Sequence, residues 1–335
     1  MSKRKLSKKQ EWRAQKIQDE RIQRAEKKLK KLQTGDEASE STSHNGFVVA
    51  SFGTQFIVED DHKQRFKSLA RQNLGAIVVG DKIVFETFEH GDAVITAVLA
   101  RDSLLERPNF NGNTKPVAAN IDQILVMSSI LPTLATVLID RYLVAIELSE
   151  IDPIIVINKI DLLNPDELKT LKDSLSYYED IGYNIIFVAT KSREGLSMIE
   201  HILHDKVSIL VGQSGVGKSS TIKALLPDIE IQIGELSTIS KLGKHTTSAS
   251  QWYHLAASGA IIDSPGVRDF GLWHLEKENV AWGFREFRPY LGTCKYSNCS
   301  HINEPECSII DAVDNKKIPT ERWGNYIKIY LSLKE

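Results

Sequence analysis

The sequence contains few cysteines and no long apolar run. Only 3 of its 335 residues are cysteine, so they cannot all pair with one another, and a small scaffold held by disulfides is excluded. No stretch reaches the roughly 18 uninterrupted apolar residues of a membrane span. The chain opens MSKRKLSKKQEWR, which is not an apolar signal segment. We therefore expect a cytoplasmic protein without a membrane partner, large enough for more than one hydrophobic core.

Basic residues are concentrated at the start of the chain. Residues 1–31 contain 13 Lys or Arg and 4 Asp or Glu, a net charge of +9, so the acidic remainder must carry −11 to give the overall −2. Such an arm can bind a polyanion such as RNA, or it is a solvated tail without a partner. Its apolar residues keep no heptad, which argues against a coiled coil. We predict that residues 1–45 form this basic arm and a polar linker.

Short alternating apolar runs follow, separated by glycine-containing turns. Residues 46–104 contain four or five such runs, which predicts a small closed β-barrel of the OB type. Barrels of this kind often bind oligonucleotides on one face, and a purely structural or protein-binding barrel remains an open alternative. Residues 101–122 are interpreted as a connector.

Longer apolar strands alternate with amphipathic helices in residues 105–272. This pattern predicts an α/β domain with a parallel sheet covered by helices on both faces. The helices are clearest at residues 134–150 and 166–180. The expected strands are residues 123–129, 153–158, 183–189, 207–212 and 259–264.

A glycine-rich loop lies between the strand at 207–212 and the next helix. It fits the phosphate-binding pattern GxxxxGK[ST] in the required context. Glycines let backbone N–H groups surround the phosphates, Lys218 would reach the β- and γ-phosphates, and the Ser219 hydroxyl would bind Mg²⁺. The nucleotide-binding residues predicted in this segment are Gly212, Gln213, Ser214, Gly215, Val216, Gly217, Lys218, Ser219 and Ser220.

A second motif, Asn158-Lys159-Ile160-Asp161, follows the strand at 153–158 and fits NKxD. The Asp161 carboxylate can accept hydrogen bonds from both the N1–H and the 2-amino group of guanine, and adenine offers neither donor. Asn158 would tie the loop together, and the Lys159 stem would cover the base. The motif therefore favours GTP, and leaves a P-loop ATPase as a weaker alternative.

The loop after the strand at 183–189 reads Ala189-Thr190-Lys191. Many small GTPases have Ser-Ala-Lys at this place and offer a backbone N–H to the guanine O6. A backbone contact does not depend on the side chain, so we expect it to be kept here.

Two further segments would surround the γ-phosphate. Residues 263–266 match DxxG, with Asp263 supporting Mg²⁺ through water and the Gly266 N–H facing the phosphate. A Gly-Lys-His-Thr-Thr segment at 243–247 lies between the phosphate loop and DxxG, where a switch threonine reaches the metal. We choose Thr247 over Thr246 for this role.

The order of these motifs is informative, because NKxD precedes the phosphate loop, the switch threonine and DxxG. The usual GTPase order is therefore circularly permuted. Over residues 46–335 the chain resembles the circularly permuted, ribosome small-subunit-dependent GTPases of bacterial type. The resemblance implies an OB-type barrel, a permuted P-loop GTPase domain over 105–272 and a C-terminal α-helical zinc-binding module over 273–335. It also implies GTP and GDP with magnesium as ligands, and the small ribosomal subunit with its rRNA as partner.

All three cysteines lie together with one histidine near the C-terminus. Cys294, Cys299, His301 and Cys307 form the pattern C-x4-C-x-H-x5-C. Three thiolates and one imidazole complete a closed tetrahedral zinc site, which argues for a structural ion, one per chain. Buried free cysteines are the alternative, which a loop as polar as KYSNCSHINEPEC does not favour, and the resemblance also implies zinc at these positions.

Catalysis needs a group that orients the attacking water. Ras-like enzymes place a glutamine directly after DxxG, whereas this chain has the apolar Val267. We therefore expect slow hydrolysis in isolation, and a group supplied either by His245 in the switch or by the partner. The resemblance points to a switch histidine, which His245 matches, although an ordinary loop histidine is nearly as good an interpretation. The predicted catalytic residues are thus His245, Lys218 and Thr247.

These observations predict an enzyme that hydrolyses GTP to GDP and phosphate. By resemblance, it would bind the small (30S) ribosomal subunit or its precursor and act in late assembly as a monomer. The barrel, the zinc module and the arm would contact rRNA, while the GTPase domain would time release. An RNA-binding scaffold with a structural guanine nucleotide is the alternative.

Overall fold

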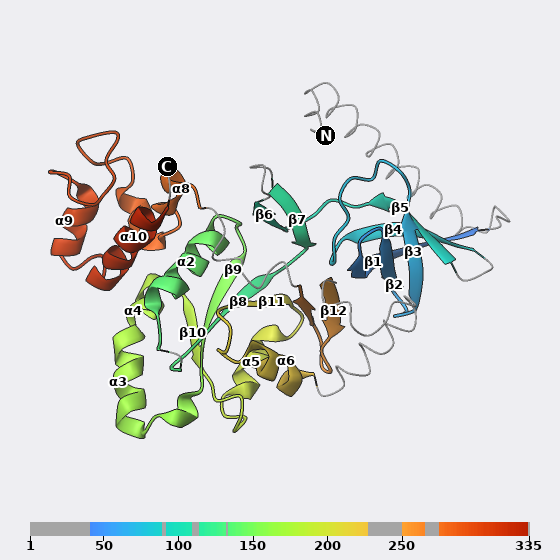
Figure 1. The fold of residues 1–335 in the computed structure, drawn as a ribbon, viewed down its shortest axis with the longest axis horizontal. Helices are drawn as coiled ribbons and strands as arrows, with labels where there is room; N and C mark the ends of the chain where they lie inside the picture. The colour runs from blue at the N-terminus through green and yellow to red at the C-terminus, as the bar shows by residue number, and fades with distance from the viewer. Residues whose placement is uncertain are drawn as a thin grey trace.

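Five strands close a small barrel at one side of the molecule (Figure 1). The computed structural model describes residues 41–88, 92–108, 114–131, 133–226, 250–264 and 275–333. The strand order is β1-β2-β3-β5-β4, closed by pairing between β4 and β1, with a parallel pair only at β3–β5. This topology is that of an OB fold, so the predicted barrel is confirmed. Its strands are β1 (Ser41–Phe52), β2 (Gln55–Asp60), β3 (Arg65–Ala70), β4 (Lys82–Phe88) and β5 (Asp92–Val98).

Two features of the barrel were not expected from the sequence. Strand β1 begins at Ser41, inside the segment interpreted as a polar linker, because Ser41–Phe47 pairs with β4. A side chain at Gly46 would meet the Glu59 carbonyl oxygen at 2.1 Å, so glycine lets β1 and β2 approach closely there. Strand β3, with the sequence RFKSLA, was not singled out because only one of its residues is buried.

The segment interpreted as a connector forms a β-hairpin. Strands β6 (Leu104–Pro108) and β7 (Thr114–Ala119) pair as a separate two-stranded antiparallel sheet. Its buried end packs on the barrel, where the Ala119 N–H donates to the Val79 carbonyl at 3.0 Å. The polar and turn-forming residues at 109–113 hid this short hairpin in the sequence.

The strands that follow the hairpin in the sequence form a largely parallel sheet, as predicted. Its parallel strands run in the order β10-β9-β8-β11-β13, and β12 is added antiparallel to β13. Strand β12 also pairs with β1, so the barrel and the parallel strands form one sheet of eleven strands in the described residues. These strands are β8 (Gln123–Ser129), β9 (Asp152–Asn158), β10 (Asn184–Phe187), β11 (Val207–Val211), β12 (Ser250–His254) and β13 (Ala260–Asp263).

Helices cover both faces of the parallel strands. Alternate residues of β9 enter different cores: Ile155 and Ile157 pack with α2 and α4, while Ile154 and Val156 pack with α5 and α6. The helix expected at 166–180 is divided into two at Ser176. The helical elements are α2 (Thr136–Glu147), η1 (Ile160–Leu162), α3 (Pro165–Leu175), α4 (Tyr177–Ile181), α5 (Leu196–Leu203) and α6 (Lys218–Leu225).

The C-terminal module, residues 275–333, is helical and packs against α2 (Figure 1). Its elements are α8 (Lys277–Val280), η3 (Arg285–Tyr290), α9 (Ser308–Asp314) and α10 (Thr320–Ser332). The fully buried Arg322 on α10 forms ion pairs with Asp140 on α2 and with Glu286 on η3. Asp140 also accepts hydrogen bonds from Tyr178 at 2.6 Å and from Asn325 at 2.7 Å. Every partner of the buried charges is itself charged or polar, so the module is fixed to the sheet domain by a satisfied network.

Some predictions fall outside the described residues. These are the basic arm at 1–31 and the residues His245, Thr246, Thr247, Gly266 and Val267. Within the described part of the chain, none of the helices is both long and apolar enough to span a bilayer.

Candidate functional site

The phosphate-loop sequence connects β11 to α6 through a backbone that requires glycine. Gly212, Gly215 and Gly217 have φ values of +137°, +82° and +107°, a region that other residues rarely adopt. A side chain at Gly212 would meet the Met127 carbonyl oxygen at 2.1 Å. The three glycines therefore allow a tight loop to pass directly over the end of β8.

The end of this loop carries the polar groups expected to meet phosphate. The Lys218 ammonium donates to the carbonyl oxygens of Gly212 and Gln213, both at 2.6 Å, and so lies back over the loop. Ser219 and Ser220 are exposed in the first turn of α6. That turn has neither an acidic residue nor a side-chain cap in the described chain, which suits a helix N-terminus to an anion.

The NKxD segment is bonded directly to the phosphate loop. Asn158, which is 2 % exposed at the end of β9, donates its amide N–H to the Val216 carbonyl at 2.9 Å. The Lys159 ammonium donates to the Gly215 carbonyl at 2.7 Å and to the Leu131 carbonyl at 2.5 Å. A side chain at Gly217 would lie 2.1 Å from the Asn158 amide nitrogen. Two motifs more than fifty residues apart therefore form one surface.

Asp161 lies at the exposed side of the same loop. Lys159 adopts a left-handed conformation with φ of +67°, after which Ile160–Leu162 forms the 3₁₀ helix η1. Ile160 is buried, and its N–H donates to the Val188 carbonyl at 3.3 Å. Ile160 thus anchors the loop in the protein interior, while Asp161 is exposed to solvent.

The Ala189-Thr190-Lys191 loop is bonded to the same asparagine. Thr190 donates to the Asn158 side-chain oxygen from its N–H at 3.1 Å and from its hydroxyl at 3.0 Å. Its hydroxyl also lies 2.9 Å from that of Thr221, which is fully buried on α6. Since an amide oxygen only accepts, the Thr221 hydroxyl must donate to Thr190. Thr221 is not predicted from the sequence, where its only signal is its place one helical turn after Lys218.

Asp263 is placed beside the phosphate loop by the parallel sheet. It ends β13, which pairs with β11, so both strands deliver their following residues to one edge. Opposite Asp263, in register, lies Gln251 on β12. The next residue, Ser264, is buried and bonds through its hydroxyl to that of Ser250 at 2.7 Å.

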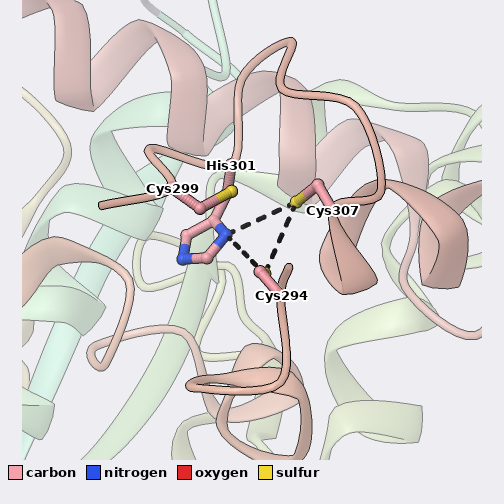
Figure 2. A group of neighbouring side chains, drawn as sticks. All are labelled: Cys294, Cys299, His301 and Cys307. Carbon is pink, nitrogen blue, oxygen red and sulfur yellow. Dashed lines mark hydrogen bonds between the residues drawn. The ribbon is translucent and has the colours of Figure 1, made fainter. Parts of the chain in front are cut away.

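The four predicted metal ligands converge in the C-terminal module (Figure 2). The His301 Nδ1 atom lies 3.5 Å from the Cys294 sulfur and 3.4 Å from the Cys307 sulfur, and these two sulfurs are 3.9 Å apart. With Cys299, all four ligand atoms lie within 4.8 Å of one another. The cluster can therefore hold one metal ion between three thiolates and one imidazole.

The loop around the cluster is held by hydrogen bonds outside the ligand set. Trp323 and Tyr326 on α10 donate to the carbonyl oxygens of His301, at 2.9 Å, and Ser300, at 2.7 Å. Glu304 accepts from the N–H of Ser300 at 2.8 Å and of Ile302 at 3.0 Å. Burial alone would raise the pKa of the Glu304 carboxyl, but these hydrogen bonds outweigh it and lower the pKa to about 2.

Without a metal ion, burial favours the neutral forms of the ligands. It raises the pKa of the Cys299 thiol to about 12, raises that of Cys307, and lowers that of His301. A neutral imidazole is the form that binds metal, whereas the thiols must lose protons to do so. Metal binding would therefore release protons and stabilise the module at the same time.

The chain is similar to proteins of one enzyme family along almost its whole length. The family model described as RsgA GTPase matches residues 98–273. "Small ribosomal subunit biogenesis GTPase RsgA 1" of Vibrio vulnificus is 44 % identical over 324 residues, which are 95 % of this chain and 92 % of that protein. "Small ribosomal subunit biogenesis GTPase RsgA" of Hahella chejuensis is 43 % identical over 340 residues, 100 % and 98 % of the two chains.

Solved structures agree with these sequence matches. The crystal structure of YjeQ from Thermotoga maritima superposes with a TM-score of 0.71 at 32 % identity, covering 87 % of this chain and 99 % of that one. YloQ, described as a circularly permuted GTPase, shares the fold with a TM-score of 0.68 at 22 % identity, covering 89 % of this chain and 97 % of that one. The order of motifs, the barrel, the cysteine cluster and these similarities agree, and the chain belongs to the RsgA family of GTP-hydrolysing enzymes.

Proposed function

We propose that this GTPase acts on the small ribosomal subunit in its late assembly, binding in the GTP state and leaving after hydrolysis. The relatives at 41–44 % identity bear the name of a small ribosomal subunit biogenesis GTPase. The structural observation that carries the nucleotide part is the bonding of Asn158 and Lys159 to the phosphate loop. Because both motifs share one surface, a single guanine nucleotide can span them.

For the nucleotide, each loop contributes one kind of contact. Asn158, Lys159, Ile160 and Asp161 form the base site, with Asp161 accepting from guanine. Gly212–Ser220 binds the phosphates, with Lys218 at the β- and γ-phosphates. Guanine O6 would accept from the Lys191 N–H, because the N–H groups of Ala189 and Thr190 already donate to Glu194 and Asn158. The Lys191 N–H has no partner in the described part of the chain.

For hydrolysis, Ser219 and Thr247 would bind Mg²⁺, and Asp263 would support it through water. The Gly266 N–H would face the γ-phosphate. Val267 cannot orient the attacking water, so intrinsic turnover is slow and needs His245 or a group from the partner. Magnesium supplies charge neutralisation at the phosphates; the residues named here hold and orient them.

For the C-terminal cluster, zinc is the metal that we propose. Tetrahedral Zn²⁺ with Zn–S near 2.3 Å and Zn–N near 2.05 Å separates sulfurs by about 3.8 Å and sulfur from nitrogen by about 3.6 Å. For Cys294, His301 and Cys307 the observed 3.9 Å and 3.4–3.5 Å agree with these values, and the Cys299 sulfur lies within 4.8 Å of the other ligand atoms. Since four protein ligands leave no open position, the ion is structural.

For the ribosomal partner, we propose the barrel, the zinc module and the basic arm as rRNA-contacting parts of a cytoplasmic monomer. In this division the arm and linker end before β1, which begins at Ser41, the barrel extends to residue 104, the GTPase domain takes residues 105–272 and the zinc module 273–335. The arm's net charge of +9 suits a phosphate backbone, whereas the rest of the chain is acidic.

Guanine recognition is tested by Asp161→Asn. The amide can present a donor to the 2-oxo group of xanthine, where the carboxylate can only accept. Nucleotide competition should shift preference from GTP towards XTP. Asp166→Asn, in the first turn of α3, is the control and should keep GTP. An Asp161→Asn protein that still prefers GTP contradicts the assignment.

The ribosomal role is tested by GTP hydrolysis in the presence of purified subunits. Small subunits should stimulate turnover, and large subunits should not. An RNA-binding scaffold with a structural nucleotide would bind small subunits without faster turnover, so this outcome would favour the alternative.

A further inference from the structure

Strand β12 belongs to both halves of the large sheet. On one side it pairs with β13 over four residues, including Gln251 opposite Asp263. On the other side only two residue pairs join it to β1 of the barrel, Ala50 with Gln251 and Ser51 with Ser250. The backbone connection to the barrel is therefore short, and side chains must supply most of the attachment.

The buried Glu59 contributes to that attachment through a contact with His254, and Trp252 on β12 also packs against apolar residues of β1 and β2. The Glu59 carboxylate on β2 lies 2.6 Å from the His254 Nε2 atom at the end of β12, and it accepts from Arg65 on β3 at 2.8 Å. The side chain of Glu59 is 2 % exposed, whereas those of Arg65 and His254 are 11 % and 27 % exposed. Beside these side chains, the rings of Phe47 on β1 and Trp252 on β12 are 4.8 Å apart.

The opposite end and edge of β12 lead to the nucleotide site. Ser250, its first residue, follows the switch candidate Thr247 by three positions. Its hydroxyl bonds to that of Ser264, which follows the DxxG residue Asp263. A shift of β12 relative to the barrel would therefore displace Asp263, because Asp263 is paired with Gln251 on β12.

We propose that Glu59 and His254 are positioning residues through which the barrel controls hydrolysis. They fix β12 to the barrel, so that the small subunit, by holding the barrel, aligns Asp263, which is paired with Gln251 on β12. This inference rests on the proposed function, because it explains how subunit binding raises turnover. A merely structural role would lower stability without changing the ratio of stimulated to intrinsic turnover.

The experiment compares Glu59→Gln and His254→Gln with a matched barrel variant, Asp81→Asn. Asp81 is also a fully buried barrel carboxylate, paired with Arg101 at 2.6 Å, but none of its hydrogen bonds reaches β12. For each protein, the intrinsic turnover, the turnover with saturating small subunits and the subunit affinity with a non-hydrolysable GTP analogue are measured. Thermal unfolding reports any loss of stability.

Glu59→Gln and His254→Gln should each lower stimulated turnover about fivefold or more, the usual scale of coupling between sites. Intrinsic turnover and subunit affinity should stay within about twofold, and Asp81→Asn should keep full stimulation. The double variant should be no worse than either single one, because both changes act on the same contact between positions 59 and 254. If Glu59→Gln does not fold, His254→Gln alone decides the test, because the more exposed His254 side chain is easier to replace without unfolding the protein.

The experiment distinguishes a failure of the positioning role from a failure of the proposed function. If the parent is stimulated and both variants are stimulated equally, or lose no more than Asp81→Asn, the positioning role is wrong and the proposed function stands. If small subunits do not stimulate the parent, the proposed function fails, and this inference fails with it.

Discussion

Gly217→Ala tests whether the base site and the phosphate site act as one unit. Gly217 has a φ of +107°, and an added Cβ would lie 2.1 Å from the Asn158 amide nitrogen. An ordinary contact of about 3.5 Å requires the amide to retreat by about 1.4 Å. That retreat breaks its bond to the Val216 carbonyl, now 2.9 Å long, and separates the two loops.

Gly215→Ala is the matched control in the same loop. Gly215 also has a positive φ, +82°, but no heavy atom lies within 4 Å of an added Cβ. Both variants carry backbone strain of about 1–2 kcal/mol, whereas only Gly217→Ala loses the Asn158 contact, at about 1–3 kcal/mol. In the free Gly217→Ala protein, the loop that carries Asn158 and the phosphate loop lie further apart. A nucleotide that contacts both loops must bring them together again when it binds. The additional cost therefore appears in nucleotide affinity.

The measurement is the affinity for fluorescent GDP in the presence of Mg²⁺, with thermal unfolding as a check on folding. Gly217→Ala should bind GDP about 5- to 150-fold more weakly than Gly215→Ala, because the additional 1–3 kcal/mol converts to this range at 1.4 kcal/mol per tenfold. Equal affinities in two folded variants would show that the contact between Asn158 and the loop does not support nucleotide binding.

Three further predictions concern the C-terminal module. Cys299→Ser should remove the single equivalent of zinc found by metal analysis and unfold the module locally; full retention would refute the ligand set. The pKa of Glu304 is lowered from 4.5 to about 2, so its stabilisation is complete above pH 4.5 and lost as the pH falls towards 2. The difference in unfolding free energy between the parent and Glu304→Gln should shrink over that range, and a constant difference would contradict this. Arg322→Leu leaves Asp140 buried without its cation and should cost about 3–5 kcal/mol in urea unfolding, whereas Arg322→Leu combined with Asp140→Leu should cost less than the sum of the two single changes.

The sequence predicts best where one strong physical signal acts locally. Strand β8 occupies the predicted residues 123–129, because its buried central residues Ile-Leu-Val-Met form the continuous apolar run typical of a parallel strand covered on both faces. The phosphate loop and the NKxD segment were found because glycine, lysine and acidic residues stand at fixed spacings. The cysteine cluster was found because every cysteine of the chain takes part in it.

The sequence predicts poorly where structure depends on distant partners. Strands β3 and β12 have weak patterns of their own, with one buried residue each, and exist because of the strands beside them. Glu59 and His254 are 195 positions apart, and neither stands in a motif. Thr221 resembles any small polar residue on a helix until Thr190 is seen beside it.

Circular permutation preserves the nucleotide site because its loops are joined by noncovalent contacts. Parallel pairing brings the ends of β9, β10, β11 and β13 to one edge whatever the order of connection. The hydrogen bonds from Asn158 and Lys159 then join segments 58 and 56 positions apart. In this chain β12 borders the barrel, and β13 precedes the C-terminal module in sequence. The barrel and the C-terminal module are thus adjacent, in the sheet or in the sequence, to the segments that we expect to contact the γ-phosphate.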